Sequence, residues 1–340
     1  MKKIILNKNE NHYGPSPQCI KILHNFDPRH MFFYNSQKQS DLFTALFRYY
    51  SIAEDKIILG YGLEDILRTL FDRLLPKKDC VVTSDFHFSY YTDYLQKIHI
   101  TTYTFRCVEK KHIFSFDVED CITQCKKNNP KLLLITSPNN PTGHVITVKE
   151  LIQILNAINK NTIVVLDEAY YGFDQHYDEQ AFLSLLNTYA NVMILRTFSK
   201  YYALAGLRIG FALCGTNVIQ NIGYQQRYLG FSRILEEVAV AALHSPEYYQ
   251  KNAKKIIKTR EEFIQQINML NHFTAFESKA NFVCIKIHTP AMKKIKKEQK
   301  QQVQIGKLIM KQYMRVTMTT PEMVHDFYIF LKNIDKKINI

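Results

Sequence analysis

The stretch Leu132–Gly143, LLLITSPNNPTG, decides the fold class of this chain. It opens with an unbroken aliphatic run, which is typical of a strand buried on both faces of a parallel sheet. Prolines, asparagines and a glycine follow, and these residues favour a rigid turn with polar side chains beyond the strand end. Because open α/β sheets bind ligands at the carboxyl ends of their strands, this loop is a candidate binding site.

A second apolar run, TIVVL at residues 162–166, leads into the acidic motif DEAYYGF, Asp167–Phe173. Burying a carboxylate at a strand end without a cationic partner costs several kcal/mol. We therefore expect Asp167 to face a positive charge. Taken alone, Asp167 is also consistent with a helix N-cap, and SPNNPTG with a decorated turn.

A third apolar run, VMILR, is followed by TFSKYYALAGLRIG, Thr197–Gly210. The hydroxyls of Thr197 and Ser199 and the guanidinium of Arg208 suit a phosphate group. The amine of Lys200 lies among cations and hydroxyls, which can lower the pKa of a lysine, and such an amine suits Schiff-base chemistry.

A glycine-rich segment, GYGLEDI at Gly60–Ile66, stands at a predicted strand-to-helix junction. Backbone N–H groups at a helix N-terminus bind phosphate. The signal is weak by itself, since many such turns contain glycine. It gains weight because the chain has only 11 glycines and several of them fall in these motifs.

Seven apolar runs alternate with amphipathic segments over residues 57–213, which predicts a mainly parallel seven-stranded sheet flanked by helices. The runs are Lys56–Leu59, Cys80–Thr83, His99–Phe105, Leu132–Thr136, Thr162–Leu166, Val192–Arg196 and Ile209–Leu213.

The last third has a different pattern, typical of a smaller α+β domain. Its expected elements are a helix over Glu247–Leu270, strands at Asn281–Ile287 and Met314–Met318, a lysine-rich helix between them, and a helix from Pro321. We expect a large domain over residues 28–235. Residues 1–27 and 236–340 would form the small domain with an N-terminal arm.

Composition narrows the classes of protein further. The net charge is +13, and its one dense stretch, Lys293–Lys300, lacks the interleaved aromatics of a single-strand binder, so we expect a solvated helix and no nucleic acid. The 7 cysteines lack metal-site spacing, so we expect reduced thiols and no metal. The apolar stretch within the first ten residues is too short for the core of a secretory signal, and no apolar run in the sequence reaches membrane-spanning length. These features predict a cytoplasmic protein without a membrane partner.

Taken together, the strings GYGLEDI, SPNNPTG, DEAY and SKYYALAGLRIG resemble the fold-type I enzymes that use pyridoxal 5′-phosphate (PLP). The spacings of 33 residues from Asp167 to Lys200 and 8 from Lys200 to Arg208 (200 − 167 and 208 − 200) are normal for those enzymes. Within them, LNKNENHYGPSP at Leu6–Pro17 is similar to the histidinol-phosphate aminotransferases. The resemblance covers nearly the whole chain.

The resemblance implies a role for each matching residue. Lys200 would bind PLP as a Schiff base and move a proton, and Asp167 would keep the pyridinium nitrogen protonated. Asn140 and Tyr170 would hydrogen bond to the phenolic oxygen of the cofactor, while Phe88 stacks on its ring. The phosphate group would be held by Gly62, Leu63, Glu64, Thr197, Ser199 and Arg208.

The same resemblance implies a homodimer. Tyr34 would reach the phosphate of the neighbouring subunit's cofactor, and Tyr13 would line the substrate pocket across the interface. Arg315, in MRVTM, matches the arginine that holds the anionic group of the substrate.

The chain departs from the family pattern at the substrate side. Phenylalanine stands at Phe88 where a tyrosine is frequent, and the proline usual in the loop DFHFSYY is missing. The segment before Arg315 is short, and the nearest candidate for a second substrate cation is Lys311, a point charge in place of a guanidinium fork. The substrate pocket is therefore expected to be altered while the cofactor site is intact.

Three functions remain open at this point. The leading one is transamination between glutamate (2-oxoglutarate) and a phosphorylated ketone, either imidazole acetol phosphate or a smaller ketone such as dihydroxyacetone phosphate. A second is decarboxylation of phosphoserine or phosphothreonine, because spacing does not reveal which Cα bond is broken. A non-enzymatic basic binder is the third, kept open only by the charge of the chain.

Overall fold

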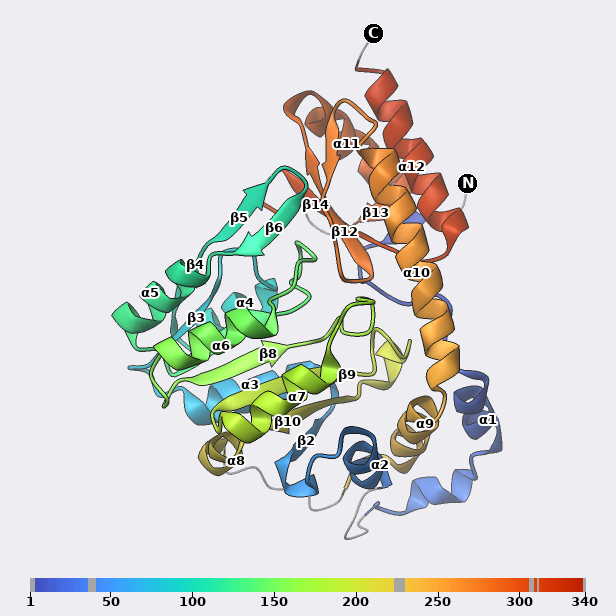
Figure 1. Ribbon diagram of the computed structural model, residues 1–340. Coiled ribbons are helices and arrows are strands. Elements are labelled where there is room, and N and C mark those ends of the chain that lie inside the picture. The colour runs from blue at the N-terminus through green and yellow to red at the C-terminus, as the bar shows by residue number, and fades with distance from the viewer. Residues whose placement is uncertain (1–3, 36–40, 223–229, 306–308, 311, 339–340) are drawn as a thin grey trace.

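A seven-stranded sheet is the centre of the larger part of the molecule (Figure 1). The computed structural model describes residues 4–35, 41–222, 230–305, 309–310 and 312–338. The strands, in spatial order, are β2 (Ile57–Gly60), β10 (Gly210–Cys214), β9 (Val192–Thr197), β8 (Ile163–Asp167), β7 (Leu132–Thr136), β3 (Cys80–Ser84) and β4 (Thr101–Phe105). Each coincides, within two residues at either end, with one of the predicted apolar runs.

The sheet is parallel except at one strand. β9, β8, β7, β3 and β4 pair in parallel, whereas β10 is antiparallel to both of its neighbours, β2 and β9. The prediction of a mainly parallel α/β sheet is confirmed. The reversal at β10 was not foreseen, because an apolar run carries no information about strand direction.

Helices cover both faces of this sheet. One face is covered by α3 (Gly62–Leu74), α4 (Ser89–Lys97) and α8 (Thr216–Ile222), and the other by α2 (Asp41–Tyr50), α5 (Val118–Asn128), α6 (Val148–Ala157), α7 (Glu179–Thr188) and α9 (Arg233–Leu243). Local sequence fixes where α6 begins, because Thr147 and Glu150 form a reciprocal capping box there.

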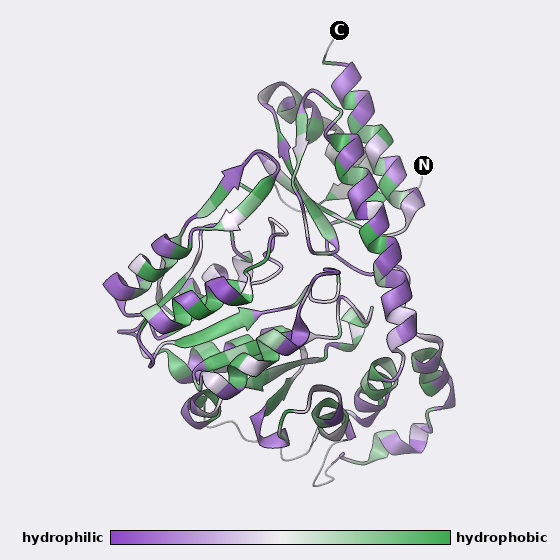
Figure 2. Cartoon of the chain, in the orientation of Figure 1, coloured by the Kyte–Doolittle hydropathy of each residue, from purple (hydrophilic) through white to green (hydrophobic). Residues whose placement is uncertain are grey.

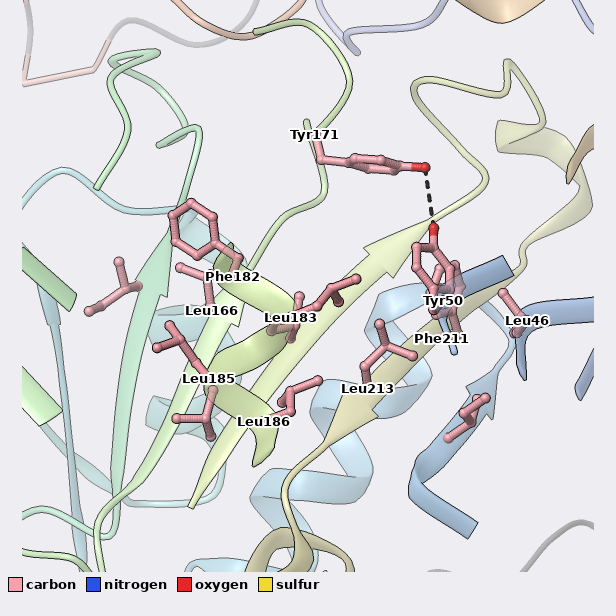
Figure 3. Packing of buried hydrophobic residues seen from close by; sticks show 14 of the residues in the cluster. Leu46, Tyr50, Leu166, Tyr171, Phe182, Leu183, Leu185, Leu186, Phe211 and Leu213 are labelled. Carbon is pink, nitrogen blue, oxygen red and sulfur yellow. Dashed lines mark hydrogen bonds between the residues drawn. The ribbon is translucent and has the colours of Figure 1, made fainter. Parts of the chain in front are cut away.

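Each face has its own hydrophobic core. Along β8, Val164 and Leu166 join one cluster while Ile163 and Val165 join the other, which explains the unbroken apolar run of this strand. The central strands β7 and β8 are accordingly almost wholly hydrophobic, and the flanking helices are amphipathic (Figure 2). Figure 3 shows part of the first cluster, including the 3.4 Å contact between the hydroxyls of Tyr50 and Tyr171.

The last third forms a smaller α+β unit around an antiparallel sheet of order β11-β12-β14. Its elements are α10 (Pro246–Ile267), β11 (Phe273–Ala275), β12 (Phe282–Ile287), α11 (Thr289–Gln302), β13 (Val303–Ile305), β14 (Tyr313–Thr317) and α12 (Pro321–Lys336). The expected long helix, lysine-rich helix, two strands and terminal helix are all present. The short β11 and β13 were not predicted.

The N-terminal segment joins both parts of the molecule. Its first strand, β1 (Ile4–Leu6), pairs in parallel with β13, and α1 (Pro17–Asn25) packs against α9. Two short 3₁₀ helices, η1 (Pro28–Phe32) and η2 (Glu54–Lys56), flank α2. The domain limits at residues 27–28 and 235–236 stay a prediction.

A hairpin that the sequence did not predict reaches from the large sheet to the small one. It consists of β5 (Cys107–Lys110) and β6 (Ile113–Phe116). Glu109 accepts a hydrogen bond from the Tyr313 hydroxyl at 2.5 Å and pairs with Lys286 Nζ at 2.8 Å. The hairpin therefore ties β14 and β12 to the large domain.

All seven cysteines are free. Within the described ranges, no helix combines the length and apolarity needed to cross a membrane, and no cluster of three potential metal-ligating side chains occurs.

Candidate active site

The carboxyl ends of the parallel strands meet at one edge of the large sheet, where they open onto a cavity of ≈ 370 Å³. Most of the residues singled out from the sequence line it: Leu63, Glu64, Phe88, Asn140, Asp167, Tyr170, Thr197, Ser199, Lys200, Arg208 and Arg315. The loops that carry the polar motifs are thus brought together by the fold.

The loop after β7 is held rigidly. Asn139 is fully buried, and its amide donates to the Phe86 carbonyl at 2.9 Å and to Thr142 Oγ1 at 2.7 Å. Gly143 has φ +81°, and a Cβ there would lie 2.3 Å from Ser278 Oγ, so only glycine fits. The peptide bonds before both prolines of the loop are cis. Asn140 is thereby presented to the cavity.

Asp167, at the end of β8, is a buried carboxylate without a cation beside it. Its partners are the Tyr91 hydroxyl at 2.5 Å and the Ala169 backbone N–H at 3.0 Å, and no Lys or Arg of the described chain forms an ion pair with it. Burial raises the pKa of Asp167, and the two hydrogen bonds lower it only in part. The expected positive charge is thus not supplied by the described residues, and a bound cationic group could supply it.

Lys200 follows β9, and its amine lies inside the cavity. Nζ donates to the Lys8 carbonyl at 2.7 Å, and the ammonium lies 5.8 Å from the centre of the Tyr170 ring. Burial, and then the charge of Arg315, lower the pKa of Lys200 from 10.5 to about 8. About one tenth of the amine is therefore uncharged, and nucleophilic, near pH 7, far more than for an ordinary lysine.

This lowered pKa gives a testable pH dependence. We expect the rate at which the apo-protein captures PLP covalently to rise about tenfold per pH unit and to level off above about pH 8, because only the uncharged amine reacts. Stopped-flow absorbance measures this rate. A profile that is already flat well below pH 8 would mean that the amine is not the limiting group.

The other end of the cavity forms an anion cradle. Thr197 Oγ1 lies 3.0 Å from Ser199 Oγ, and Arg208 Nη1 lies 3.5 Å from the same Ser199 oxygen. Gly62, at the start of α3, has φ +78°, and a Cβ there would lie 2.6 Å from Arg208 Nη2. The missing side chain thus lets the guanidinium approach the N-terminus of α3, where backbone N–H groups favour an anion.

Between these ends, three side chains form a connected group. Asn140 Nδ2 donates to the Tyr170 hydroxyl at 3.2 Å, and Asn140 Oδ1 accepts from Arg315 Nη1 at 2.7 Å. The second Arg315 Nη donates to the Asn7 carbonyl at 2.6 Å. Arg315 therefore enters the cavity from β14 with its orientation set by both parts of the molecule.

Three predicted residues are absent from the cavity lining of this chain, and a fourth cannot be placed. Gly62 lies just behind it, and Tyr34 is 74% exposed. Tyr13 lies against α10, with Lys255 Nζ 5.2 Å from its ring centre. Lys311 lies outside the described residues.

Two contributions to the site were not foreseen from the sequence. Tyr91, whose hydroxyl bonds Asp167, was part of the quoted DFHFSYY loop but was not singled out. The arm residues Asn7, Lys8 and Asn9 contact Arg315, Lys200 and Tyr170 in turn. Two of these three contacts use backbone carbonyls, which every residue type has, so the sequence does not reveal them. The third uses an asparagine with φ +54°, a conformation that asparagine tolerates.

These features match the chemistry of one cofactor from end to end. PLP carries an aldehyde that condenses with an amine, a ring nitrogen that is cationic when protonated, and a phosphate. The cavity offers Lys200, the uncompensated Asp167 and the cradle at Arg208. The fold and the cavity therefore define a PLP-dependent enzyme of the α/β type.

Comparison with known proteins narrows the class. The family model of aminotransferase class I and II matches residues 1–328. The chain is 30% identical to a histidinol-phosphate aminotransferase of Clostridium botulinum, over 99% of this chain and 93% of that protein. The chain belongs to the aminotransferase class I and II family and is a PLP-dependent aminotransferase.

Solved structures agree with this fold. That of histidinol-phosphate aminotransferase from Sinorhizobium meliloti, in complex with PLP, has a TM-score of 0.86 at 22% identity and covers 99% of this chain and 92% of its own. That of L-threonine-O-3-phosphate decarboxylase from Porphyromonas gingivalis has a TM-score of 0.78 at 17% identity, with 97% and 98% coverage.

Proposed function

We propose that this enzyme transfers an amino group between glutamate and a small phosphorylated keto compound. The observation that carries the proposal is Arg315, which brings to the cavity a second guanidinium besides that of Arg208. Its Nε is buried and has no hydrogen-bond partner among the described residues. A second anion, from the substrate, would use the donors that remain. The names of the relatives from Clostridium botulinum and Sinorhizobium meliloti support a phosphorylated substrate of the histidinol-phosphate type.

In this proposal the side chains around the cofactor have distinct tasks. Bound PLP supplies an electron sink for the carbanion that forms at the substrate Cα. Asp167 holds the positive charge of the ring, and Lys200 carries the proton between substrate and cofactor. Asn140 and Tyr170 hold the phenolic oxygen, and Arg208, Ser199 and Thr197, with the backbone of Gly62, Leu63 and Glu64, hold the phosphate. Phe88, half-exposed at the cavity, covers the ring face.

The test offers a panel of ketones to the purified enzyme with glutamate, and follows release of 2-oxoglutarate. We expect activity with imidazole acetol phosphate or with dihydroxyacetone phosphate, and an Arg315→Lys variant with a KM raised by at least about tenfold, since a point charge replaces a fork. Activity restricted to an unphosphorylated aromatic keto acid would refute the proposal that the substrate carries a phosphate.

A second candidate is decarboxylation of a phosphorylated amino acid such as phosphoserine or phosphothreonine. The similarity in fold to the Porphyromonas gingivalis decarboxylase supports this candidate. The two reactions differ in which Cα bond stands perpendicular to the cofactor ring, and the same residues serve both. Carbon dioxide release from O-phosphoserine or O-phosphothreonine without a keto acceptor would replace the first candidate by the second.

The active unit of the proposal is a homodimer in the cytoplasm. Around η1, four apolar side chains in succession are exposed to solvent: Met31 76%, Phe32 80%, Phe33 75% and Tyr34 74%. Such a run on the surface is typical of a covered interface. A second copy on this surface would let Tyr34 reach the phosphate in the neighbouring cavity.

Mixed dimers test this arrangement. Dimers that contain one Lys200→Ala chain and one Tyr34→Ala chain have one complete site if Tyr34 serves the neighbour. Random mixing of the two inactive or impaired proteins should then restore roughly a quarter of wild-type activity. Mixing that restores nothing, although light scattering shows dimers, would assign Tyr34 to another role.

A further inference from the structure

Asn9 of the N-terminal arm is fully buried and makes four hydrogen bonds. Its backbone N–H donates to Thr317 Oγ1 at 3.0 Å, and its Oδ1 accepts from the same hydroxyl at 3.1 Å. Its carbonyl accepts from Asn281 Nδ2 at 3.1 Å. Its Nδ2 donates to the Tyr170 hydroxyl at 3.1 Å. Every polar group of this residue is thus engaged, and one bond leads directly into the active site.

The hydroxyl of Tyr170 receives two amide donors. Asn9 Nδ2 at 3.1 Å is one, and Asn140 Nδ2 at 3.2 Å is the other. A phenol oxygen that accepts two hydrogen bonds has no further acceptor capacity, so its own hydrogen has to be donated elsewhere. In the described part of the chain no acceptor for that hydrogen is found, and Tyr170 lines the cavity. The hydrogen therefore points toward the space that a ligand would fill.

Asn9 also joins this tyrosine to the strand that carries the substrate arginine. Thr317 stands two residues after Arg315 on β14, on the same face of the strand. The charged groups that face Tyr170 are Arg315 from β14, Asp167 at its own strand end and Lys200 from the loop after β9. Asn9 itself contributes only an amide, while its arm neighbours Lys8 and Glu10 act electrostatically on Lys200.

We propose that Asn9 is a positioning residue whose amide makes the Tyr170 hydroxyl an obligate donor into the cavity, toward the phenolic oxygen of the cofactor. The inference rests on the role proposed above for Tyr170. It gives the N-terminal arm a task in the chemistry of the site, through a group that never touches the substrate.

The substitution Asn9→Asp reverses the bond without changing its shape. A carboxylate oxygen in place of Nδ2 is an acceptor, so the Tyr170 hydrogen turns toward the new carboxylate and leaves the cavity. The phenolic oxygen of the cofactor then loses its donor and gains a nearby negative charge. Both effects favour the protonated form of the bound cofactor, so the pKa that its absorbance reports should rise by about 1 pH unit or more.

The experiment titrates the absorbance of PLP-loaded wild type, Asn9→Asp and Asn11→Asp. Asn11 is the matched control, because it is also a buried arm amide but donates to the Tyr201 carbonyl at 3.1 Å, away from the cavity. We expect the upward shift only in Asn9→Asp. An unshifted pKa in Asn9→Asp, with cofactor bound, would make Asn9 a structural tie and overturn the inference.

A double-mutant comparison covers the case in which Asn9→Asp does not fold. Asn9→Ala should shift the absorbance pKa in wild type but not in a Tyr170→Phe background, since the hydroxyl is then absent. Equal shifts in both backgrounds would overturn the inference. Failure of the proposed function is distinguishable, because it is measured by inactivity in the ketone assay, whereas the absorbance titration of bound PLP needs no substrate.

Discussion

Replacing Lys200 with alanine is expected to abolish turnover, with a loss on the order of 10⁴-fold or more, while the protein still folds. The variant loses both the amine that bonds the cofactor and the group that moves the proton. The fold should persist because Lys200 contributes one hydrogen bond, to the Lys8 carbonyl, and lies at a cavity, outside the hydrophobic clusters. Steady-state kinetics and thermal unfolding measure the two effects separately.

A covalent label gives an independent readout of the same residue. Borohydride reduction should leave a pyridoxyl group on the wild-type peptide that contains Lys200, and none on the variant. Lys258→Ala, on the exposed surface of α10, is a suitable control and should keep both label and rate. A wild-type protein without label at residue 200 would remove the basis of the assignment.

Asp167→Asn should lower turnover on the order of 10³-fold, because the isosteric amide no longer holds the cationic ring. Asp167→Ala should lose as much, but it also leaves the buried Tyr91 hydroxyl without its acceptor, so the asparagine is the cleaner change. Kinetics with saturating PLP measure the loss. Turnover close to the wild-type value in either variant would refute the role of the carboxylate.

Asp167→Asn should lower turnover without lowering the stability of the apo-protein. Burial raises the folded-state pKa of Asp167, so in the apo-protein its ionisation opposes folding as pH rises from the unfolded value of 3.8 through that raised pKa. At neutral pH the apo form of Asp167→Asn should therefore unfold at a temperature no lower than wild type. A marked drop would mean that the carboxylate stabilises the empty fold.

Asp335→Asn is the matching control for a buried carboxylate elsewhere. Asp335 in α12 accepts from the His272 backbone at 2.9 Å and pairs with the His272 ring at 2.9 Å. The amide weakens both bonds, so stability should fall while turnover is retained. The two aspartates thus predict opposite patterns, which a general defect in folding would not produce.

The sequence predicted those features that depend on local pattern and residue type. Most of the seven strands were visible because strands buried on both faces are nearly continuously apolar, and the polar loops of the site were visible because each follows such a run. The strand direction of β10, the β5–β6 hairpin and the pairing of β1 with β13 were not, because they depend on contacts between segments far apart in the chain.

Residues that act through the backbone or across space were the hardest to predict. The Lys8 carbonyl bonds Lys200, yet any residue at position 8 supplies a carbonyl. Tyr91 was only one of several aromatic residues in the quoted loop DFHFSYY until the fold placed its hydroxyl on Asp167. The expected placements of Tyr13 and Tyr34 require a second subunit and stay predictions.

The reversal of the chain at β10 has a consequence for how the enzyme can vary. Thr197 ends β9 and is paired with Gly210, which begins β10, so the twelve residues between them form one closed loop. Lys200 and Arg208, which would hold two neighbouring substituents of one rigid ring, the aldehyde carbon and the phosphate, both belong to that loop. An inserted or deleted residue there would change the span between the two anchors, whereas the loops after β7 and β8 carry one anchor each. We therefore expect the number of residues in this connection to tolerate change less than any other length in the protein, even where its individual side chains can be substituted.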